Sequence, residues 1–261
     1  MSAIVVSDGL IHYEVIGRGR PLVFIHGWLG SWRYWVPTME ELSVSHRTYA
    51  FDLWGFGDSD KLSKPYSINV YVELLEQFLD QLGVMHPTLV GHALGGVIAL
   101  QFASQASDRV EQVVGVSMPL VGAAINRPLA GFSGGGDALA RLAARRVKFS
   151  EVEMEVRKTD VSAVTDSMRS VMENDLRRVV LSLDIPVLLV YGKDDPFIKP
   201  PQQGWLQGCD DNVRAISLDG AHHFPMLEER NKFNRLLKDF LEAGDDLASL
   251  ELKEEWQRRL R

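Results

Sequence analysis

The chain has 261 residues, a formal net charge of −7 and hydrophobic residues at 46 % of its positions. This composition is ordinary for a globular protein with one sizeable core. The excess of acidic residues disfavours a sequence-independent grip on nucleic acid. Cys209 is the single cysteine, which excludes an intramolecular disulfide and a cysteine-based zinc site.

The first residues of the chain and the short length of its apolar runs favour a soluble, cytoplasmic protein. Residues 1–8 lack the basic start and apolar run of a secretory signal. No stretch approaches ~18 consecutive apolar residues, so no membrane span is expected. A secreted chain whose signal has already been removed would show the same features. The sequence does not predict an oligomeric state.

Strand-like and helix-like segments alternate along most of the chain, which predicts a mostly parallel central sheet with helices on both faces. Strands are expected at residues 11–16, 21–25, 47–51, 88–90, 113–116, 185–190 and 213–217. Helices are expected at residues 32–42, 67–82 and 227–241, near 200–207, and directly after Gly95 through Ile98, Phe102 and Ala106. The helix at 67–82 is amphipathic, and Gly83 suits its C-terminal cap.

Residues 118–180 interrupt this alternation. They contain a glycine triplet at 134–136, several helical patterns and no clear strand. We interpret them as a cap, or lid, inserted into an α/β core domain formed by residues 1–117 and 181–261. The highly charged residues 245–261 are expected to form a frayed, solvated helix in preference to a dimer contact.

The segment Gly91-His92-Ala93-Leu94-Gly95 lies between a predicted strand and a predicted helix. This context is the one that a Gly-x-Ser-x-Gly nucleophile elbow requires. Flanking glycines leave room for the sharp turn that raises the middle residue above the sheet edge. The same turn aims the next backbone N–H, that of Leu94, at the reacting centre.

A second element, His26-Gly27-Trp28, directly follows the buried strand at 21–25. In a strand–turn–helix site of this kind, the loop after a neighbouring strand supplies another oxyanion donor. The backbone N–H of Trp28 is the candidate. An ordinary strand–loop junction with a glycine turn is the alternative interpretation of this short motif.

Candidate acids and bases also follow predicted strands. Asp194 and Asp195 come after the strand at 185–190, and either carboxylate could orient a histidine ring. His222 and His223 come after the strand at 213–217. As adjacent residues they are poorly placed to converge on one metal ion, so no metal site and no cofactor are expected. Turn chemistry alone would also explain the aspartates.

Together the elements occur in the order nucleophile position, acid, base, which is the order given for α/β-hydrolases. The chain resembles that superfamily in its small, esterase-like branch, over nearly its whole length. The resemblance is carried by His26-Gly27-Trp28, residues 52–60, Gly91–Gly95, Gly192–Asp195 and His223-Phe224-Pro225. It implies an α/β-hydrolase fold with Asp195 as the acid and His223 as the base.

The departure from the family pattern is Ala93, which stands where the nucleophilic serine belongs. A methyl group cannot attack a carbonyl, so an acyl-enzyme cannot form at this residue. Two hypotheses account for it: a serine-to-alanine change introduced into an active hydrolase, or a natural non-catalytic relative that binds a ligand or partner. The otherwise complete set of partners favours the first.

For the serine form, the predicted activity is carboxylic-ester hydrolysis through an acyl-enzyme. The substrate is expected to be a small ester with an apolar or aromatic group. Its predicted contacts are the aromatic residues near the site loops, Trp28, Phe56, Phe197 and Phe224. Lactone opening, C–C bond hydrolysis and acyl transfer on the same scaffold are alternatives. Some of these aromatic side chains could simply pack the core.

Overall fold

The computed structural model describes residues 2–7, 9–28, 30–62, 65–126, 149–202, 204, 212–247 and 250. Several predictions concern residues outside these ranges: Cys209, the glycine triplet at 134–136, the end of the helix near 200–207, and residues 251–261. Within the described ranges, no helix combines the length and the apolar character needed to cross a bilayer.

The described residues form one eight-stranded sheet in the order β1-β2-β4-β3-β5-β6-β7-β8. The strands are β1 Ser2–Val6, β2 Gly9–Gly17, β3 Arg20–Ile25, β4 His46–Phe51, β5 Thr88–His92, β6 Gln112–Val116, β7 Val187–Gly192 and β8 Val213–Leu218. β1 and β2 are antiparallel to their neighbours, and the other six strands are mutually parallel. The prediction of a mostly parallel sheet is confirmed.

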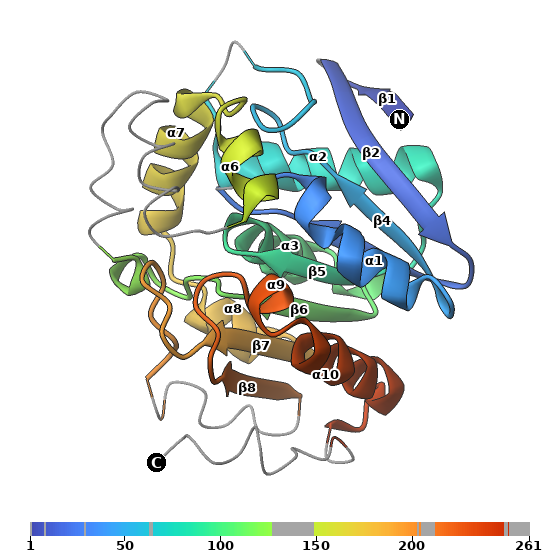
Figure 1. The fold of residues 1–261 in the computed structure, drawn as a ribbon, viewed down its shortest axis with the longest axis vertical. Coiled ribbons are helices and arrows are strands. Elements are labelled where there is room, and N and C mark those ends of the chain that lie inside the picture. The colour runs from blue at the N-terminus through green and yellow to red at the C-terminus, as the bar shows by residue number, and fades with distance from the viewer. Residues whose placement is uncertain are drawn as a thin grey trace.

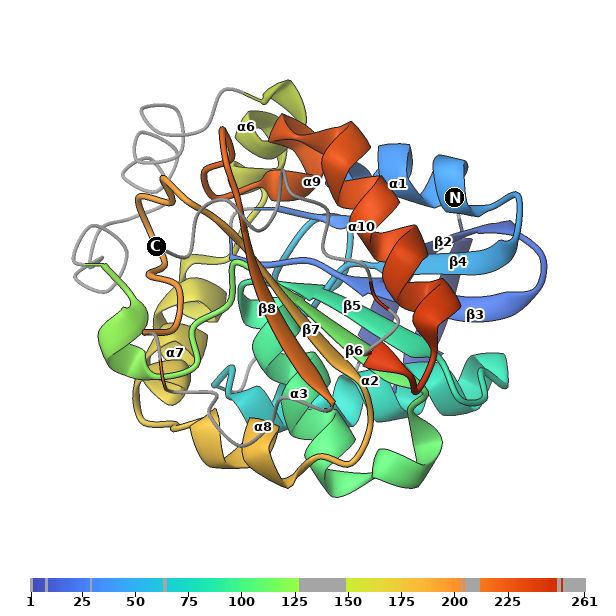
Figure 2. The same ribbon diagram turned by 90° about the horizontal axis from the view of Figure 1, so that it is seen from below.

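Helices cover both faces of this sheet. They are α1 Val36–Leu42, α2 Ile68–Leu82, α3 Leu94–Gln105, α6 Ser150–Val156, α7 Val161–Met172, α8 Arg177–Ser182, α9 Pro225–Glu228 and α10 Arg230–Ala243. α1, α9 and α10 lie on one face, and α2, α3 and α8 lie on the other (Figures 1 and 2). α3 is apolar on nearly all sides because it is enclosed by the sheet, α2 and α8.

The amphipathic helix predicted at 67–82 is α2, and its ends follow from local chemistry. The Ser67 side chain accepts a hydrogen bond from the Val70 N–H at the start of the helix. Gly83 ends it with a φ of 60°, the left-handed conformation that favours glycine. Its buried face packs on the sheet, where Phe78 stacks on Phe51 with ring centroids 4.4 Å apart.

Some local expectations differ from the structure. β1 was not among the predicted strands: it pairs with β2 and forms the sheet edge beside the strand predicted at 11–16. The final helix is divided into α9 and α10 at Glu229. The expectation of a solvated segment after residue 245 is wrong for Leu247 and Leu250, which are 1 % and 6 % exposed. Packing against the core removes their apolar surface from water.

The region predicted to be a cap contributes α6 and α7, which lie beyond the carboxyl ends of the parallel strands (Figure 1). The segment between them is tied to the loop after β4: the Asp160 N–H donates to the Gly55 carbonyl at 2.7 Å. The Asp160 carboxylate also accepts from the Tyr66 hydroxyl at 2.9 Å. α8 runs across the predicted boundary at residue 180, so the sequence pattern does not mark a helix end there.

Candidate active site

Ala93 lies in the sharp turn between β5 and α3. Its φ of 48° and ψ of −110° are unusual for a residue with a Cβ and cost about 1–3 kcal/mol. The turn is held by the Ala93 N–H, which donates to the Val116 carbonyl at 2.8 Å. A Cβ on Gly91 would lie 2.2 Å from the Gly95 oxygen, and one on Gly95 would lie 2.2 Å from the Ile25 oxygen. Both glycines are therefore required by close backbone approach.

The loop after β3 passes directly beside this turn. A Cβ on Gly27 would lie 2.8 Å from the Ala93 Cβ, so Gly27 makes room for the side chain at position 93. The Gly27 carbonyl accepts a hydrogen bond from His26 Nδ1 at 2.9 Å. In a trans peptide the C=O and N–H point in opposite directions, so this bond also fixes the direction of the Trp28 N–H.

The tautomer of His26 follows from its second hydrogen bond. The Leu53 N–H donates to His26 Nε2 at 2.9 Å, and a backbone N–H can only donate, so the ring proton is on Nδ1. Burial lowers the pKa of His26 to about 4. The ring therefore stays neutral and keeps its hold on the Gly27–Trp28 peptide at neutral pH.

The structure brings Asp195 and His223 together. His223 Nδ1 lies 2.9 Å from Asp195 Oδ2, and the two side chains are 3 % and 0 % exposed. Asp195 Oδ1 accepts from the N–H groups of Phe197 at 2.8 Å and Ile198 at 3.0 Å. Burial by itself would raise the pKa of Asp195, but the His223 ring and these hydrogen bonds outweigh it, and the pKa is lowered. The ionised carboxylate holds the His223 proton on Nδ1 and leaves Nε2 as a base.

The neighbouring candidates lie elsewhere. The Asp194 residue is exposed. The His222 side chain is 56 % exposed, and its ring lies 3.5 Å from the Glu228 carboxylate. The backbone N–H of His222 donates to the same carboxylate at 2.6 Å. Neither residue joins the Asp195–His223 pair.

Four aromatic residues predicted to contact substrate are almost fully buried: Trp28, Phe56, Phe197 and Phe224. Phe197 and Phe224 meet the His223 ring edge-on, with centroids 5.0 and 5.2 Å away. Phe56 meets the His26 ring in the same way at 5.2 Å. These three phenylalanines shield the His26 and His223 rings from water. Trp54 is also buried, at 4 % exposed, whereas Trp32 is partly exposed.

Two residues that the sequence did not single out as site residues support the loop after β3. The Trp28 Nε1–H donates to Ser167 Oγ of α7 at 3.0 Å. Ser167 lies in an ordinary amphipathic helix, and no motif marks it. Asp52 accepts from the Trp32 N–H and the Asp58 N–H, each at 2.9 Å, which joins the loop after β3 to the loop after β4. The segment 52–60 carried the resemblance, but its sequence alone did not indicate this bridge.

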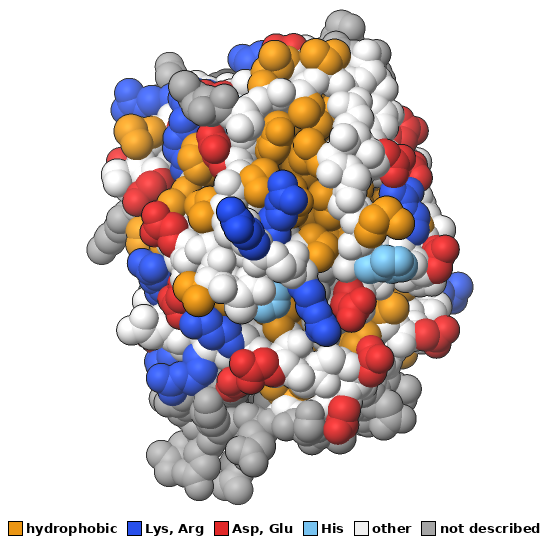
Figure 3. Space-filling view, turned by 90° about the vertical axis from the view of Figure 1, so that its right-hand side faces the viewer, with side chains coloured by type: hydrophobic (Ala, Val, Ile, Leu, Met, Phe, Trp, Pro, Cys, Tyr) orange, Lys and Arg blue, Asp and Glu red, His pale blue; other side chains and the backbone are white. Residues whose placement is uncertain are grey.

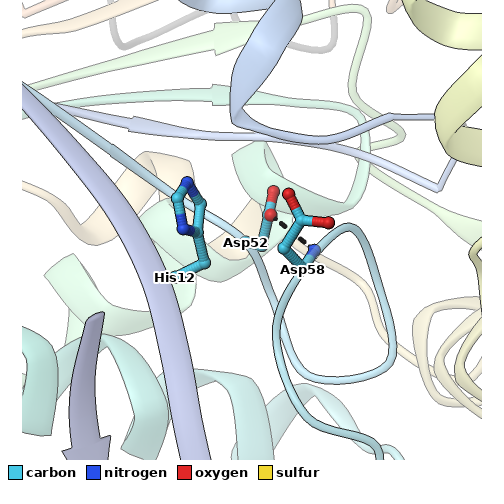
Figure 4. Close-up of side chains that lie close together, drawn as sticks. All are labelled: His12, Asp52 and Asp58. Atoms are coloured by element: carbon cyan, nitrogen blue, oxygen red, sulfur yellow. Dashed lines mark hydrogen bonds between the residues drawn. The ribbon is translucent and has the colours of Figure 1, made fainter. Parts of the chain in front are cut away.

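His12, Asp52 and Asp58 each place a ligand atom within 4.8 Å of the others (Figure 4). The dashed line in the figure is the Asp58 N–H donating to Asp52. Two cationic side chains already contact the Asp58 carboxylate, namely Arg33 at 2.9 Å and Lys158 at 2.9 Å. The protein's own cations therefore meet this charge, and the arrangement does not favour a metal ion.

A cavity of about 330 Å³ opens at the opposite end of the sheet. It is lined by Arg20, His46, Thr88 and Gln112, which begin β3, β4, β5 and β6 respectively. Figure 3 shows the molecule from the side where these strands begin, with hydrophobic side chains in a strip beside basic and histidine side chains. This cavity is separate from the Asp195–His223 pair, which follows the carboxyl ends of strands.

A mainly parallel sheet with a strained turn after β5, an adjacent glycine loop and a buried Asp–His pair is the architecture of the α/β-hydrolases. A model of the alpha/beta hydrolase fold family matches residues 20–177, more than half of the sequence. The chain belongs to this family.

Individual relatives are distant but cover nearly the whole chain. The chain is 25 % identical over 254 residues to a pimeloyl-(acyl-carrier protein) methyl ester esterase of Aliivibrio fischeri, covering 88 % of this chain and 97 % of the relative. It is similar to the enol-lactonase of Burkholderia xenovorans LB400, with a TM-score of 0.81, 21 % identity, and coverage of 92 % and 100 %.

A second solved structure with this fold is that of a mutant hydrolase. It is a serine-to-alanine mutant of the meta-cleavage product hydrolase of Pseudomonas fluorescens IP01, complexed with acetates. The TM-score is 0.78 at 20 % identity, with coverage of 93 % of this chain and 97 % of that chain. At such identities these two structures establish the shared fold.

Proposed function

We propose that this chain, with serine at position 93, is a serine-type carboxylic-ester hydrolase, and that Ala93 marks its missing nucleophile. The observation that carries the proposal is the buried Asp195–His223 pair, whose carboxylate and imidazole are 2.9 Å apart. The ring of His92, the neighbour of Ala93, lies 4.7 Å from the His223 ring. When an ionised aspartate orients a neutral imidazole in this way, the imidazole can take a proton from a nucleophile.

In the serine form, His223 accepts the hydroxyl proton as the oxygen at position 93 attacks the ester carbonyl. The N–H groups of Trp28 and Leu94 stabilise the oxyanion, at roughly 3–4 kcal/mol per donor. His223 then returns the proton to the leaving alcohol, and the acyl-enzyme forms. Water, deprotonated by His223, hydrolyses it and regenerates the serine. Asp195 remains ionised throughout.

The strain at Ala93 supports a change from serine. Glycine adopts a φ of 48° without a Cβ penalty, so a turn that needs no side chain would be more relaxed with glycine. A Cβ is kept here, and Gly27 leaves space for it. The rival hypothesis is a natural ligand-binding relative that uses the same buried site without catalysis.

The substrate class rests on the relatives and on the aromatic walls. The esterase relative is named for a methyl ester, and the structural neighbour for an enol-lactone. We propose small carboxylic esters with an apolar or aromatic group, and we treat lactones as the nearest alternative. Phe197 and Phe224, which flank the His223 ring, are the proposed contacts, together with Trp28 and Phe56.

The test is Ala93→Ser, assayed with short p-nitrophenyl esters, methyl esters and lactones, and with a serine-reactive phosphonate. The parent chain is expected to turn over about 10⁶-fold more slowly than this variant and to remain unlabelled. His223→Ala in the serine background should abolish the activity, whereas the matched change His222→Ala should retain it. A serine variant that neither hydrolyses nor becomes labelled would overturn the proposal and favour the ligand-binding hypothesis.

A further inference from the structure

A chain of buried hydrogen bonds joins the three parts of the site. The Gly27 N–H donates to the Tyr34 hydroxyl at 2.7 Å. The Tyr34 oxygen lies 3.0 Å from His92 Nδ1, and His92 Nε2 lies 2.8 Å from the His223 carbonyl. Tyr34, His92 and His223 are 2 %, 0 % and 3 % exposed, so water does not compete for these bonds.

In each of these hydrogen bonds, the neighbouring group determines which atom donates. The His223 carbonyl can only accept, so His92 Nε2 carries the ring proton and Nδ1 of the neutral ring must accept. Tyr34 therefore donates to Nδ1, and its oxygen remains free to accept from Gly27. Burial, together with the nearby His223, lowers the pKa of His92 well below its ordinary value, which keeps the ring neutral.

The loop is built to admit the Tyr34 ring. A Cβ on Gly30 would lie 1.9 Å from Tyr34 Cε1, so this position must be glycine for the ring to reach Gly27. Tyr34 also packs edge-on against His92, with ring centroids 5.5 Å apart. Gly27 is thus held at both ends, by Tyr34 at its N–H and by His26 at its carbonyl.

We propose that Tyr34 and His92 are positioning residues. They fix the loop that carries the proposed oxyanion donor Trp28, and the main chain of the proposed base His223, in place beside the elbow. This inference rests on the proposed function. Neither side chain is assigned a contact with substrate. Their effect is exerted through the Gly27–Trp28 peptide on one side and through the His223 main chain on the other.

The kinetic test uses Tyr34→Phe in the Ala93→Ser background. Loss of the hydroxyl leaves the Gly27 N–H and His92 Nδ1 without partners. We expect kcat to fall about 10- to 100-fold, a decrease no larger than that caused by removing one complete oxyanion donor. KM should stay within about 3-fold of the value for the serine form. The matched control is Thr38→Val, which removes another buried hydroxyl, bonded to Asn234 at 3.0 Å between α1 and α10. Its kcat should stay within about 2-fold of the serine form.

His92 is tested by a rescue. His92→Gln places an amide N–H where Nε2–H donates to the His223 carbonyl, and it should retain several-fold more kcat than His92→Ala. Equal kcat values for Tyr34→Phe and Thr38→Val, measured on the folded fraction, would overturn the inference. Equal values for the two His92 variants would also overturn it.

A separate measurement needs no activity. In the parent chain with Ala93, ¹⁵N NMR should show His92 as the Nε2–H tautomer, and an Nδ1–H tautomer would contradict the chain of donors. Tyr34→Phe should shift the Trp28 amide and His223 ring signals, and Thr38→Val should leave both in place. An inactive serine form would therefore refute the proposed function, whereas unshifted signals would refute the positioning role.

Discussion

Asp195→Asn provides a sharp test of the proposed acid because the backbone dictates how the new amide must lie. Asp195 Oδ1 accepts from two backbone N–H groups, those of Phe197 and Ile198. The amide oxygen must keep this place, since the opposite orientation would leave both donors unpaired at a cost of about 1–3 kcal/mol each. The amide NH₂ then faces His223 Nδ1, where the carboxylate oxygen lay at 2.9 Å.

An NH₂ group can only donate, so His223 Nδ1 must become an acceptor and the ring proton must move to Nε2. Nε2 then carries the proton and has no free lone pair, so the ring cannot act as the proposed base. The equivalent change in the well-studied serine-protease triad lowers kcat about 10⁴-fold, which corresponds to about 5.5 kcal/mol. We expect a loss of that order.

The assay is kcat for ester hydrolysis in the Ala93→Ser background, together with ¹⁵N NMR of His223 in the parent chain. Asp194→Asn is the matched control, because this neighbouring residue is exposed. It should leave both kcat and the tautomer unchanged. If Asp195→Asn kept His223 in the Nδ1–H tautomer, or lost less than about tenfold in kcat, the orienting role of Asp195 would be refuted.

Three further changes test the supporting structure. Gly95→Ala places a Cβ 2.2 Å from the Ile25 carbonyl oxygen, a backbone atom that cannot move aside. Urea unfolding should show that the free energy of unfolding falls by about 3 kcal/mol or more. An unchanged unfolding midpoint would be incompatible with this packing. Ser167→Ala removes the acceptor of the Trp28 indole N–H and should cost about 1–3 kcal/mol, and a neutral result would mean that this bond contributes nothing. Burial raises the pKa of Asp52 to about 7, so the folded chain retains a proton that the unfolded chain releases above about pH 4, and stability falls as pH rises between these values. The parent's unfolding free energy relative to Asp52→Asn should therefore drop by about 2–3 kcal/mol from pH 5 to pH 8, and a constant difference would argue against a protonated Asp52.

The strands and the elbow could be predicted because their signals are local. Buried parallel strands are short apolar runs, and Gly91 is required within the turn itself, because a Cβ there would lie 2.2 Å from the Gly95 oxygen. The edge strand β1 was not predicted. It owes its structure to pairing with β2, and its alternating burial begins only when that partner is present.

A sequence gives little basis for choosing between two adjacent candidate site residues of the same type. Asp194 and Asp195 have the same side chain, and only the family pattern distinguished them. In the structure they differ because the backbone N–H groups of Phe197 and Ile198 donate to the Asp195 carboxylate. Tyr34 could not have been identified at all: its hydroxyl meets Gly27 and His92 only after the loop after β3 and the elbow are side by side.

The order of the site elements along the chain has a consequence for synthesis. The loop and the elbow that we propose stabilise the oxyanion follow β3 and β5, whereas Asp195 and His223 follow β7 and β8. A nascent chain that has emerged only as far as α3 would contain the proposed oxyanion donors but neither Asp195 nor His223. Ester cleavage by the serine form would therefore begin only once the last two strands join the sheet, and a partly translated chain would be harmless to the esters around it.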